Sequence, residues 1–342
     1  MNPREIIKKA GFLLDLIPTK LLIGATNKKI LLPFYHAVSN EKLHHIDNLY
    51  SSRNVELFIE DLDFFCKYFK TITIDELYQI IVDNKKISQP VFHLTFDDGL
   101  REVYTVIAPI LAKKGIPATF FVNTDFIDNK SLFFRYKISL IIDRINKNAD
   151  SELLNKLALL FEIQDNSLKT IVCEIEQLQF SDLDLINEIG ALLNIDFKAF
   201  LSKVQPYLNT KEINELKDKG FTFGSHSLNH PLFKNLNFEE QKRQISESFS
   251  FLSKQFGCKN KYFSFPFSDD KVRNNLFKWM YDVEKCRLTF GISGLKRDAN
   301  KFHLHRIQME NNFDSAEKIV KTEYLYYILK IALFKNKIKR YD

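Results

Sequence analysis

Two segments of the sequence repeat the same order of helix, glycine and apolar strand, and this repeat limits the fold more than any other feature. In residues 103–122 a helical spacing of apolar side chains stops at Gly115 and gives way to an apolar run. Residues 213–223 follow the same order, with Gly220 at the break. A glycine just past a helix and before an apolar strand is typical of units in a parallel sheet. The sequence therefore predicts an α/β fold with repeated β/α units.

Between these two units the strand patterns disappear. Residues 126–206 carry apolar stripes at helical spacing and no catalytic cluster, so we expect a helical insertion. Its expected role is a cap that shapes substrate access, with a surface for a partner as the alternative. The predicted organisation is an N-terminal amphipathic helix (1–29), an α/β domain in two parts (30–125 and 207–312), the insertion (126–206) and a C-terminal amphipathic basic helix (313–342).

Composition argues against several classes of protein. The formal net charge of +6 over 342 residues is weaker than that of a dedicated nucleic-acid binder, so we expect no nucleic-acid partner. The four cysteines lie far apart without a Cys-x-x-Cys pair, which argues against a zinc ribbon or a disulfide scaffold. No apolar run reaches the roughly 18 residues of a membrane span, and residues 1–24 lack the pattern of a secretory signal. We therefore expect a cytoplasmic protein.

Both ends of the chain mix apolar and basic side chains. Residues 4–17 and 324–340 each combine isoleucine, leucine and aromatic residues with lysine or arginine. Interfacial helices with a basic tail have this composition. Peripheral contact with the inner membrane face is therefore one expectation, and terminal helices that pack on the protein's own core are the other. The sequence does not indicate an oligomeric state.

Adjacent carboxylates follow an apolar run. Residues 91–96 are predicted to form a buried strand, and Asp97 and Asp98 come directly after it, before Gly99. In parallel α/β folds, catalytic and ligand-binding side chains gather at the carboxyl ends of strands. One aspartate can bind a cation while its neighbour accepts a proton. A plain Asp-Asp-Gly turn is the alternative interpretation.

Two histidines follow another apolar strand. His226 and His230 are four residues apart, so one helical turn would place both imidazoles on the same face, as zinc binding requires. Two neutral histidines and one carboxylate leave positions open for water and substrate, which is typical of a catalytic zinc site. With the aspartates at the other strand end, this pattern predicts metal-dependent hydrolysis.

These two motifs resemble those of the polysaccharide deacetylases with a NodB-type domain, carbohydrate esterase family 4. Segments 95–99 and 226–231 are similar to the family's first two motifs, and segment 32–38 is similar to the opening strand of many members. The resemblance implies a distorted (β/α) barrel of about seven strands and metal-dependent removal of acetyl groups from sugars. It also implies that Asp97 is the general base and that the metal, usually zinc, is held by Asp98, His226 and His230. Another divalent metal is the alternative.

Two later motifs of the family differ in this chain. The third motif of the family begins with arginine, but segment 264–267 reads Ser-Phe-Pro-Phe, which is similar to an aromatic branch of the family. The resemblance implies that Pro266 and Phe267 line the substrate groove, with the backbone N–H of Phe267 as an oxyanion donor. His305 is the predicted general acid; in the alternative alignment Arg306 is the functional residue of that segment and contacts the substrate. His36 and His93 are further possibilities for the acid.

The expected function is that of a metal-dependent hydrolase that removes N-acetyl groups from a glycan or glycan precursor through a metal-activated water. An N-acetylated carbohydrate is the expected substrate, and Zn²⁺ the expected cofactor. A hydrolase of another carbon–nitrogen amide bond is the first alternative. A catalytically inactive protein that binds glycans or acts as a scaffold is the second, because the third-motif arginine is absent.

Overall fold

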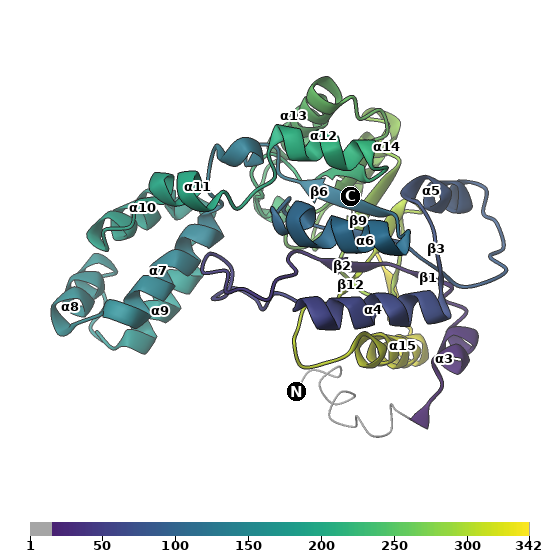
Figure 1. Ribbon diagram of the computed structural model, residues 1–342, viewed down its shortest axis with the longest axis horizontal. Helices are drawn as coiled ribbons and strands as arrows, with labels where there is room; N and C mark the ends of the chain where they lie inside the picture. The colour runs from purple at the N-terminus through teal and green to yellow at the C-terminus, as the bar shows by residue number, and fades with distance from the viewer. Residues whose placement is uncertain (1–15, 342) are drawn as a thin grey trace.

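A parallel sheet curled into a barrel forms the centre of the molecule (Figure 1). The structure is a computed structural model, and it describes residues 16–341. Along the sheet the strands are ordered β11-β9-β8-β7-β6-β5-β2-β12. Their bounds are β2 (Pro33–Tyr35), β5 (Leu94–Phe96), β6 (Ala118–Val122), β7 (Thr222–Ser225), β8 (Tyr262–Ser264), β9 (Leu288–Gly291), β11 (His303–His305) and β12 (Ile307–Gln308).

The two edges of this sheet belong to one stretch of chain. Strands β11 and β12 follow one another with only Arg306 between them, yet they lie at opposite ends of the strand order. The sheet therefore curls until its edges meet, and every pair of neighbouring strands is parallel. The predicted (β/α) barrel is confirmed. Because all strands point the same way, the segments that follow them gather at one end of the barrel.

A second, smaller parallel sheet extends the amino ends of β2 and β5. It contains β1 (Ile30–Leu31), β4 (Val91–Phe92) and β3 (Lys70–Thr71), with β4 in the middle. His93 interrupts the step from β4 to β5, and its buried ring bonds the carbonyl of Ile72 (2.8 Å) and Oγ1 of Thr119 (2.9 Å). Both ring nitrogens are thus occupied, and burial lowers the pKa of His93 to about 4. His93 is part of the core and not an acid at the barrel end.

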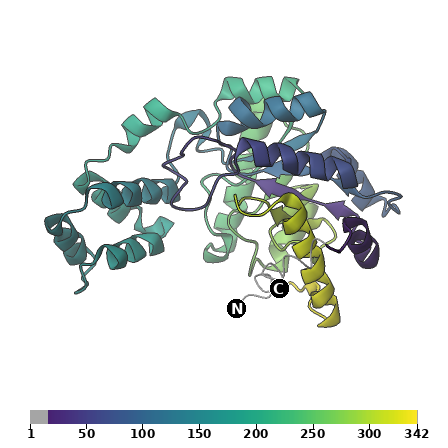
Figure 2. The same cartoon turned by 60° about the horizontal axis from the view of Figure 1, so that its bottom comes forward.

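Helices cover the outside of the barrel. They are α3 (Thr19–Thr26), α4 (Val55–Tyr68), α5 (Ile74–Val82), α6 (Ala108–Lys114), α12 (Thr210–Asp218), α13 (Phe238–Phe256), α14 (Asn274–Asp282) and α15 (Ala316–Ala332). Helix α15 packs against α3 and α4 (Figure 2). Phenylalanine rings, such as those of Phe96 and Phe120, fill the space between the sheet and these helices. Within residues 16–341, no helix combines the length and the apolar character that a membrane crossing requires.

Residues 126–206 contain an arm of helices that extends from one side of the barrel (Figures 1 and 2). Its helices are α7 (Phe134–Asn148), α8 (Ser151–Leu160), α9 (Leu168–Gln177), α10 (Leu183–Leu192) and α11 (Phe197–Val204). Helix α7 packs against α9 and α10, and buried isoleucine and leucine side chains join them. The amino-terminal end of α7 lies beside the carboxyl ends of the barrel strands, so the arm is joined to the barrel next to the residues described below.

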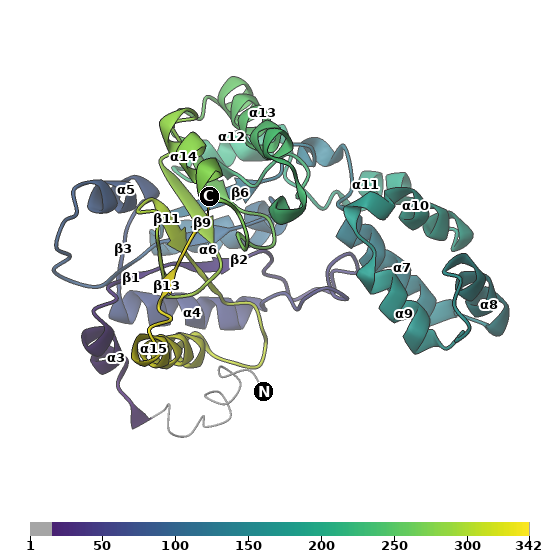
Figure 3. The ribbon, with the colours of Figure 1, turned by 180° about the vertical axis from the view of Figure 1, so that it is seen from behind.

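The two ends of the chain differ from the predicted terminal helices. The predicted helix over 1–29 lies outside the described residues as far as residue 15, and the described part is helical at residue 16 and in α3, with a break between them. The predicted helix over 313–342 is wrong beyond Ala332, because Phe334 adopts a left-handed conformation (φ 55°) and the chain turns back. Residues Lys337–Ile338 then form strand β13, parallel to β10 (Arg297–Asp298). The basic tail therefore returns to the barrel (Figure 3).

Candidate active site

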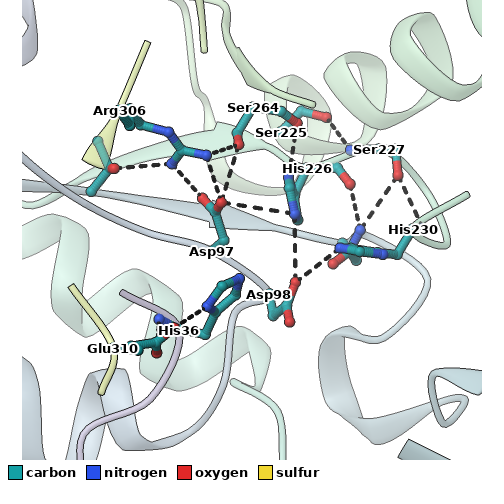
Figure 4. A network of polar contacts seen from close by, with 12 residues as sticks. His36, Asp97, Asp98, Ser225, His226, Ser227, His230, Ser264, Arg306 and Glu310 are labelled. Atoms are coloured by element: carbon teal, nitrogen blue, oxygen red, sulfur yellow. Dashed lines mark hydrogen bonds and ion pairs between the residues drawn. The ribbon is translucent and has the colours of Figure 1, made fainter. Parts of the chain in front are cut away.

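The carboxyl end of β5 directs two adjacent carboxylates into the same space (Figure 4). Asp98 (φ 69°) and Gly99 (φ 65°) both lie in the left-handed region, which turns the chain sharply at this point. A Cβ atom on residue 99 would lie 2.9 Å from Cγ1 of Val122, so only glycine fits there. The turn places both Asp97 and Asp98 in the barrel mouth, and both are buried.

Asp97 is held by a bidentate contact with an arginine. The guanidinium of Arg306 donates to Oδ1 (2.8 Å) and Oδ2 (2.7 Å) of Asp97, and the hydroxyl of Ser264 donates to Oδ2 at 3.2 Å. Burial is the largest single influence and would raise the pKa of Asp97, but the charge and hydrogen bonds of Arg306, together with the nearby His226 and His36, outweigh it and lower this pKa below its usual value. Asp97 is therefore an ionised acceptor in a fixed orientation.

The predicted role of Arg306 in contacting substrate is wrong. Its side chain is completely buried, and its guanidinium contacts Asp97, Ser264 and Thr95. Arg306 reaches this position because it is the residue between β11 and β12, where the barrel closes. It therefore orients Asp97 from a different strand, in a chain whose segment 264–267 lacks the family's arginine.

The two histidines come together on a loop, so the prediction that a helical turn joins them is wrong. After β7, Ser227 (φ 74°) and His230 (φ 61°) are left-handed, which no α-helix allows. Serine hydroxyls hold this loop: Oγ of Ser225 accepts the backbone N–H of Ser227 (3.1 Å), and Oγ of Ser227 accepts that of His230 (3.0 Å). The imidazole centroids of His226 and His230 are nevertheless 4.7 Å apart.

One oxygen and two nitrogens at this point converge without a hydrogen bond among them. Oδ1 of Asp98 lies 3.5 Å from Nε2 of His226 and 3.3 Å from Nε2 of His230, and Oδ1 is buried without a hydrogen-bond partner among the described residues. His226 donates its Nδ1–H to the carbonyl of Ser264 (2.8 Å), which leaves Nε2 free to act as a ligand. Burial lowers the pKa of His226 to about 4, so the ring is neutral at pH 7. These three atoms fit a divalent metal ion.

A tyrosine of the helical arm completes this group, and the sequence patterns did not reveal it. Tyr136, on α7, is fully buried and donates its hydroxyl to Oδ2 of Asp98 at 2.8 Å. The second oxygen of Asp98 is thereby fixed while Oδ1 stays available. The arm thus supplies a side chain that orients a candidate metal ligand, in addition to any effect on substrate access.

We expect Tyr136→Phe to weaken the binding of a divalent metal ion such as Zn²⁺ at this group by about 10- to 100-fold, because Asp98 would lose the hydrogen bond that fixes its carboxylate. Competition with a chromophoric chelator measures this affinity. Tyr50→Phe is the matched control, since the Tyr50 hydroxyl lies 3.3 Å from that of Tyr136 and forms no hydrogen bond with Asp98 among the described residues. Equal zinc affinity in wild type and Tyr136→Phe would contradict this role.

His36 follows β2 and lies beside the two aspartates (Figure 4). Its Nδ1 bonds Oε2 of Glu310 at 2.5 Å, and the backbone N–H of Ala37 donates to Oε1 of the same carboxylate at 2.8 Å. Burial by itself would lower the pKa of His36, but the Glu310 carboxylate and then the two aspartates raise it to about 9. His36 is therefore an imidazolium at neutral pH. Glu310 was also absent from the sequence prediction, because a lone glutamate after a strand carries no motif.

His305 lies in another cluster, so its predicted role as the general acid is not supported by its contacts. It is on β11 with His303, and both rings face outward toward Asp298 and Asp269. Nε2 of His305 lies 3.3 Å from Asp298, and its Nδ1 accepts the backbone N–H of Ser293. Arg340 of the C-terminal tail pairs with both aspartates. The alternation of side chains along β11–β12 points Arg306 inward and therefore His305 outward.

Replacing Arg340 by glutamine should lower the free energy of unfolding by about 3–5 kcal/mol, because Asp269 and Asp298 would lose the cation that compensates their buried charges. Urea unfolding followed by circular dichroism measures this. The adjacent Lys339→Gln removes the same charge from an exposed position and should change stability little. An unchanged unfolding midpoint in Arg340→Gln would show that the tail does not stabilise the barrel.

Aromatic side chains form one wall of the site. The ring of His230 packs between those of Phe133 and Phe267, each at a centroid distance of 4.5 Å. Phe267 remains 39% exposed, whereas Pro266 is buried. Of the two residues predicted to line a groove, only Phe267 thus offers a ring face to a bound molecule. The wall joins the barrel loop after β8 to the start of α7.

Comparison with known proteins gives one family and several similar folds. The sequence profile of the family described as "Polysaccharide deacetylase" matches residues 84–281. Among solved structures, the chain is similar to the Streptococcus pyogenes deacetylase PplD in complex with acetate, with a TM-score of 0.56 and 18% identity over 86% of this chain and 98% of that one. IcaB from Ammonifex degensii is similar with a TM-score of 0.53 and 14% identity over 86% and 97%. A de-N-acetylase from Aggregatibacter actinomycetemcomitans is similar with a TM-score of 0.52 and 14% identity over 85% and 99%. No curated protein matches significantly.

Proposed function

Because the chain belongs to the polysaccharide deacetylase family, we propose that it hydrolyses N-acetyl groups of a glycan or glycan precursor at the mouth of the barrel. The observation that carries this proposal is the convergence of Asp98, His226 and His230 on one point, beside the ionised and fully oriented Asp97. The carboxylate that would activate the attacking water and the atoms that would bind a metal ion thus lie within one buried site, as amide hydrolysis by water requires.

Asp98, His226 and His230 are the residues that would hold a metal ion, with zinc favoured by the two imidazoles and one carboxylate. Another divalent metal is the alternative. When bound, the ion would polarise the acetyl carbonyl and make an attacking water more acidic. The remaining side chains of the site then have to move protons and exclude solvent.

Asp97 takes the proton of the attacking water. Its carboxylate is ionised and is held by Arg306 and Ser264. As water adds to the acetyl carbon, one O–H bond breaks and the proton passes to Asp97. Arg306 fixes the direction of the carboxylate without contacting substrate, which makes it a positioning residue.

His36 supplies the proton for the leaving amine. When the carbon–nitrogen bond breaks, the sugar nitrogen needs a proton, and the imidazolium of His36 lies beside Asp97 and Asp98 (Figure 4). Glu310 keeps the ring protonated. The products are a sugar amine and acetic acid, which loses its remaining proton to solvent and leaves as acetate; the two proton transfers leave Asp97 protonated and His36 neutral until solvent restores them.

Acetate release tests this function. Purified protein loaded with zinc should release acetate from N-acetylated oligosaccharides and expose an equal number of free amines, which an amine-reactive dye measures. Stoichiometric zinc without acetate release from any N-acetylated sugar would contradict the proposal. In that case a different amide substrate, or a role in glycan binding without catalysis, would account for the fold.

The alkaline limb of the pH–rate profile should lie near pH 9 and report His36. The pKa of His36 is raised to about 9, so the acid is protonated below this pH and is lost as the pH rises through it. Glu310→Gln removes the charge that raises this pKa, and the limb should move toward neutral pH, with a fall of roughly tenfold or more in kcat at pH 8. An unmoved limb in Glu310→Gln would assign the acid to another group.

A further inference from the structure

A second pocket lies at a different place on the barrel from the catalytic groups. It has a volume of about 650 Å³ and is bordered by β1, β11 and the segments 84–87 and 294–301. Residues Asn27–Lys29 precede β1, and Lys301 precedes β11, so much of the pocket lies at the amino ends of strands. The catalytic aspartates and histidines follow the carboxyl ends of β5 and β7. Figure 3 shows this side of the barrel, with β1, β11 and β13 labelled.

The lining of this pocket, called here the basic pocket, is dominated by cations. They are Lys28, Lys29, Lys85, Lys86, Lys296, Arg297 and Lys301. Asp298 is the single carboxylate in the lining, and it already pairs with Arg340 at 2.7 Å and His305 at 3.3 Å. Lys85 pairs with Asp83, whereas the other six cations form no ion pair among residues 16–341. The pocket therefore holds several positive charges without a protein counter-charge.

Lys28 shows the electrostatic consequence most clearly. Its side chain is half-buried with Nζ 4.8 Å from the centre of the Tyr327 ring. Burial, and then the nearby charge of Arg297, lowers the pKa of Lys28 to about 7. Two cations held close together in a partly enclosed space repel each other, and an anion between them would relieve this repulsion. Amide side chains of Asn27, Asn84 and Asn300 add hydrogen-bond donors to the same lining.

We propose that the basic pocket binds a phosphate-bearing anion. Lysine and arginine together recognise phosphate through charge and multiple N–H donors. Nζ of Lys29 and of Lys301 donates to backbone carbonyls, which carry no net charge. The excess of cations without an ion pair therefore fits a group with two or more negative charges better than a single carboxylate. The pocket volume suits the phosphate-bearing part of one small ligand and is too small for a nucleic-acid duplex.

The phosphate group could belong to either of two kinds of molecule, and experiments can distinguish them. A free phosphate or diphosphate compound would enter from solvent. A phospholipid headgroup would enter from a membrane surface, and the nearby end of α15 exposes Leu329, Ile331, Leu333 and Phe334. Helix α15 contacts the pocket because the ring of Tyr327, on this helix, packs against Nζ of Lys28. The tail that follows the helix forms strand β13, in which Lys337 lies opposite Arg297 of β10.

Calorimetric titration of the full chain with sodium diphosphate, at constant ionic strength, is the first arm of the test. Cosedimentation with phosphatidylcholine vesicles, with and without phosphatidylglycerol, is the second. In at least one arm, Lys296→Gln/Arg297→Gln should weaken binding roughly tenfold or more, since each lost cation removes charged hydrogen bonds to phosphate. Lys113→Gln/Lys254→Gln removes the same charge from exposed helix positions outside the pocket and should bind like wild type.

Diphosphate binding that depends on Lys296 and Arg297 would identify a free phosphate compound as the ligand class. Binding to phosphatidylglycerol vesicles alone, with the same dependence, would identify a lipid headgroup. The proposal is overturned if wild type binds neither probe, or if the control pair weakens binding as much as the pocket pair. Acetate release should be unchanged in Lys296→Gln/Arg297→Gln, because neither residue contacts the catalytic groups, so this test is independent of the proposed deacetylation.

Discussion

Asp97→Asn should lower kcat for acetate release by about 10²- to 10⁴-fold, the usual contribution of a general base, while zinc binding stays close to that of wild type. The reason is a division of labour between neighbouring carboxylates. Oδ2 of Asp97 is 4.0 Å from Nε2 of His226 and is occupied by Arg306 and Ser264, whereas Oδ1 of Asp98 lies nearer to both histidines and is unpaired. Removing the charge of Asp97 therefore removes the proton acceptor and leaves the three ligand atoms.

Asparagine in place of Asp97 would leave the buried Arg306 without its partner carboxylate, so the variant needs a test that its site is still folded. Zinc content provides this internal control. A variant that binds one zinc per chain and fails to turn over has a folded site without a base. Arg306→Lys is the companion variant: it keeps the charge and loses the two-pronged geometry, so its kcat should fall between those of wild type and Asp97→Asn. Retained turnover in Asp97→Asn would show that Asp97 is not the base, and loss of zinc along with activity would contradict the prediction that the ligand atoms do not depend on Asp97.

The barrel was predictable because its signals are local and repeated. A glycine that ends a helix just before an apolar strand recurs at Gly115 and Gly220, and both strands join the parallel sheet as β6 and β7. The resemblance to polysaccharide deacetylases is confirmed by the family profile over residues 84–281. The chain is therefore a hydrolase that acts on carbon–nitrogen bonds other than peptide bonds.

The placement of single side chains was less predictable, because it depends on contacts between distant segments. Arg306 could be noticed in the sequence, but its contact with Asp97 follows from the closure of the barrel between β11 and β12. Tyr136 belongs to the arm, whose helical pattern carries no sign that one hydroxyl reaches Asp98. The His226–His230 spacing suggested a helical turn, whereas serine hydroxyls stabilise a left-handed loop there.

In the C-terminal tail too, contacts between distant segments decide where a side chain lies. A basic C-terminal segment is typical of a solvated or membrane-facing end, and the lysines at 335, 337 and 339 are all exposed. Arg340 is buried instead, since it pairs with Asp269 and Asp298, and these lie far from it in the sequence. His305 could not be separated from an acid role by sequence alone, because its partners Asp298 and Ser293 carry no recognisable motif.

His226→Ala should remove both zinc and activity. His226 presents Nε2 to the ligand position because the carbonyl of Ser264 accepts its Nδ1–H, and alanine would leave only Asp98 and His230. Loss of a partner behind a ligand already costs about 10- to 100-fold in metal affinity, so loss of the ligand itself should cost more than that. Inductively coupled plasma mass spectrometry after dialysis measures the zinc per chain, and acetate release measures the activity.

His44→Ala is the matched control for His226→Ala. His44 pairs with Asp143 on the arm, its side chain is 45% exposed, and it lies outside the group of Asp98, His226 and His230, so zinc and activity should both persist. Chelation of wild type should abolish acetate release, and added Zn²⁺ should restore it in wild type but not in His226→Ala. The outcome that would exclude a metal centre here is full activity after chelation, because the converging side chains would then have to act on the substrate directly. Zinc bound at wild-type level by His226→Ala would instead show that His226 is not a metal ligand. The hydrogen bond from its ring to the carbonyl of Ser264 would then have no role in metal binding.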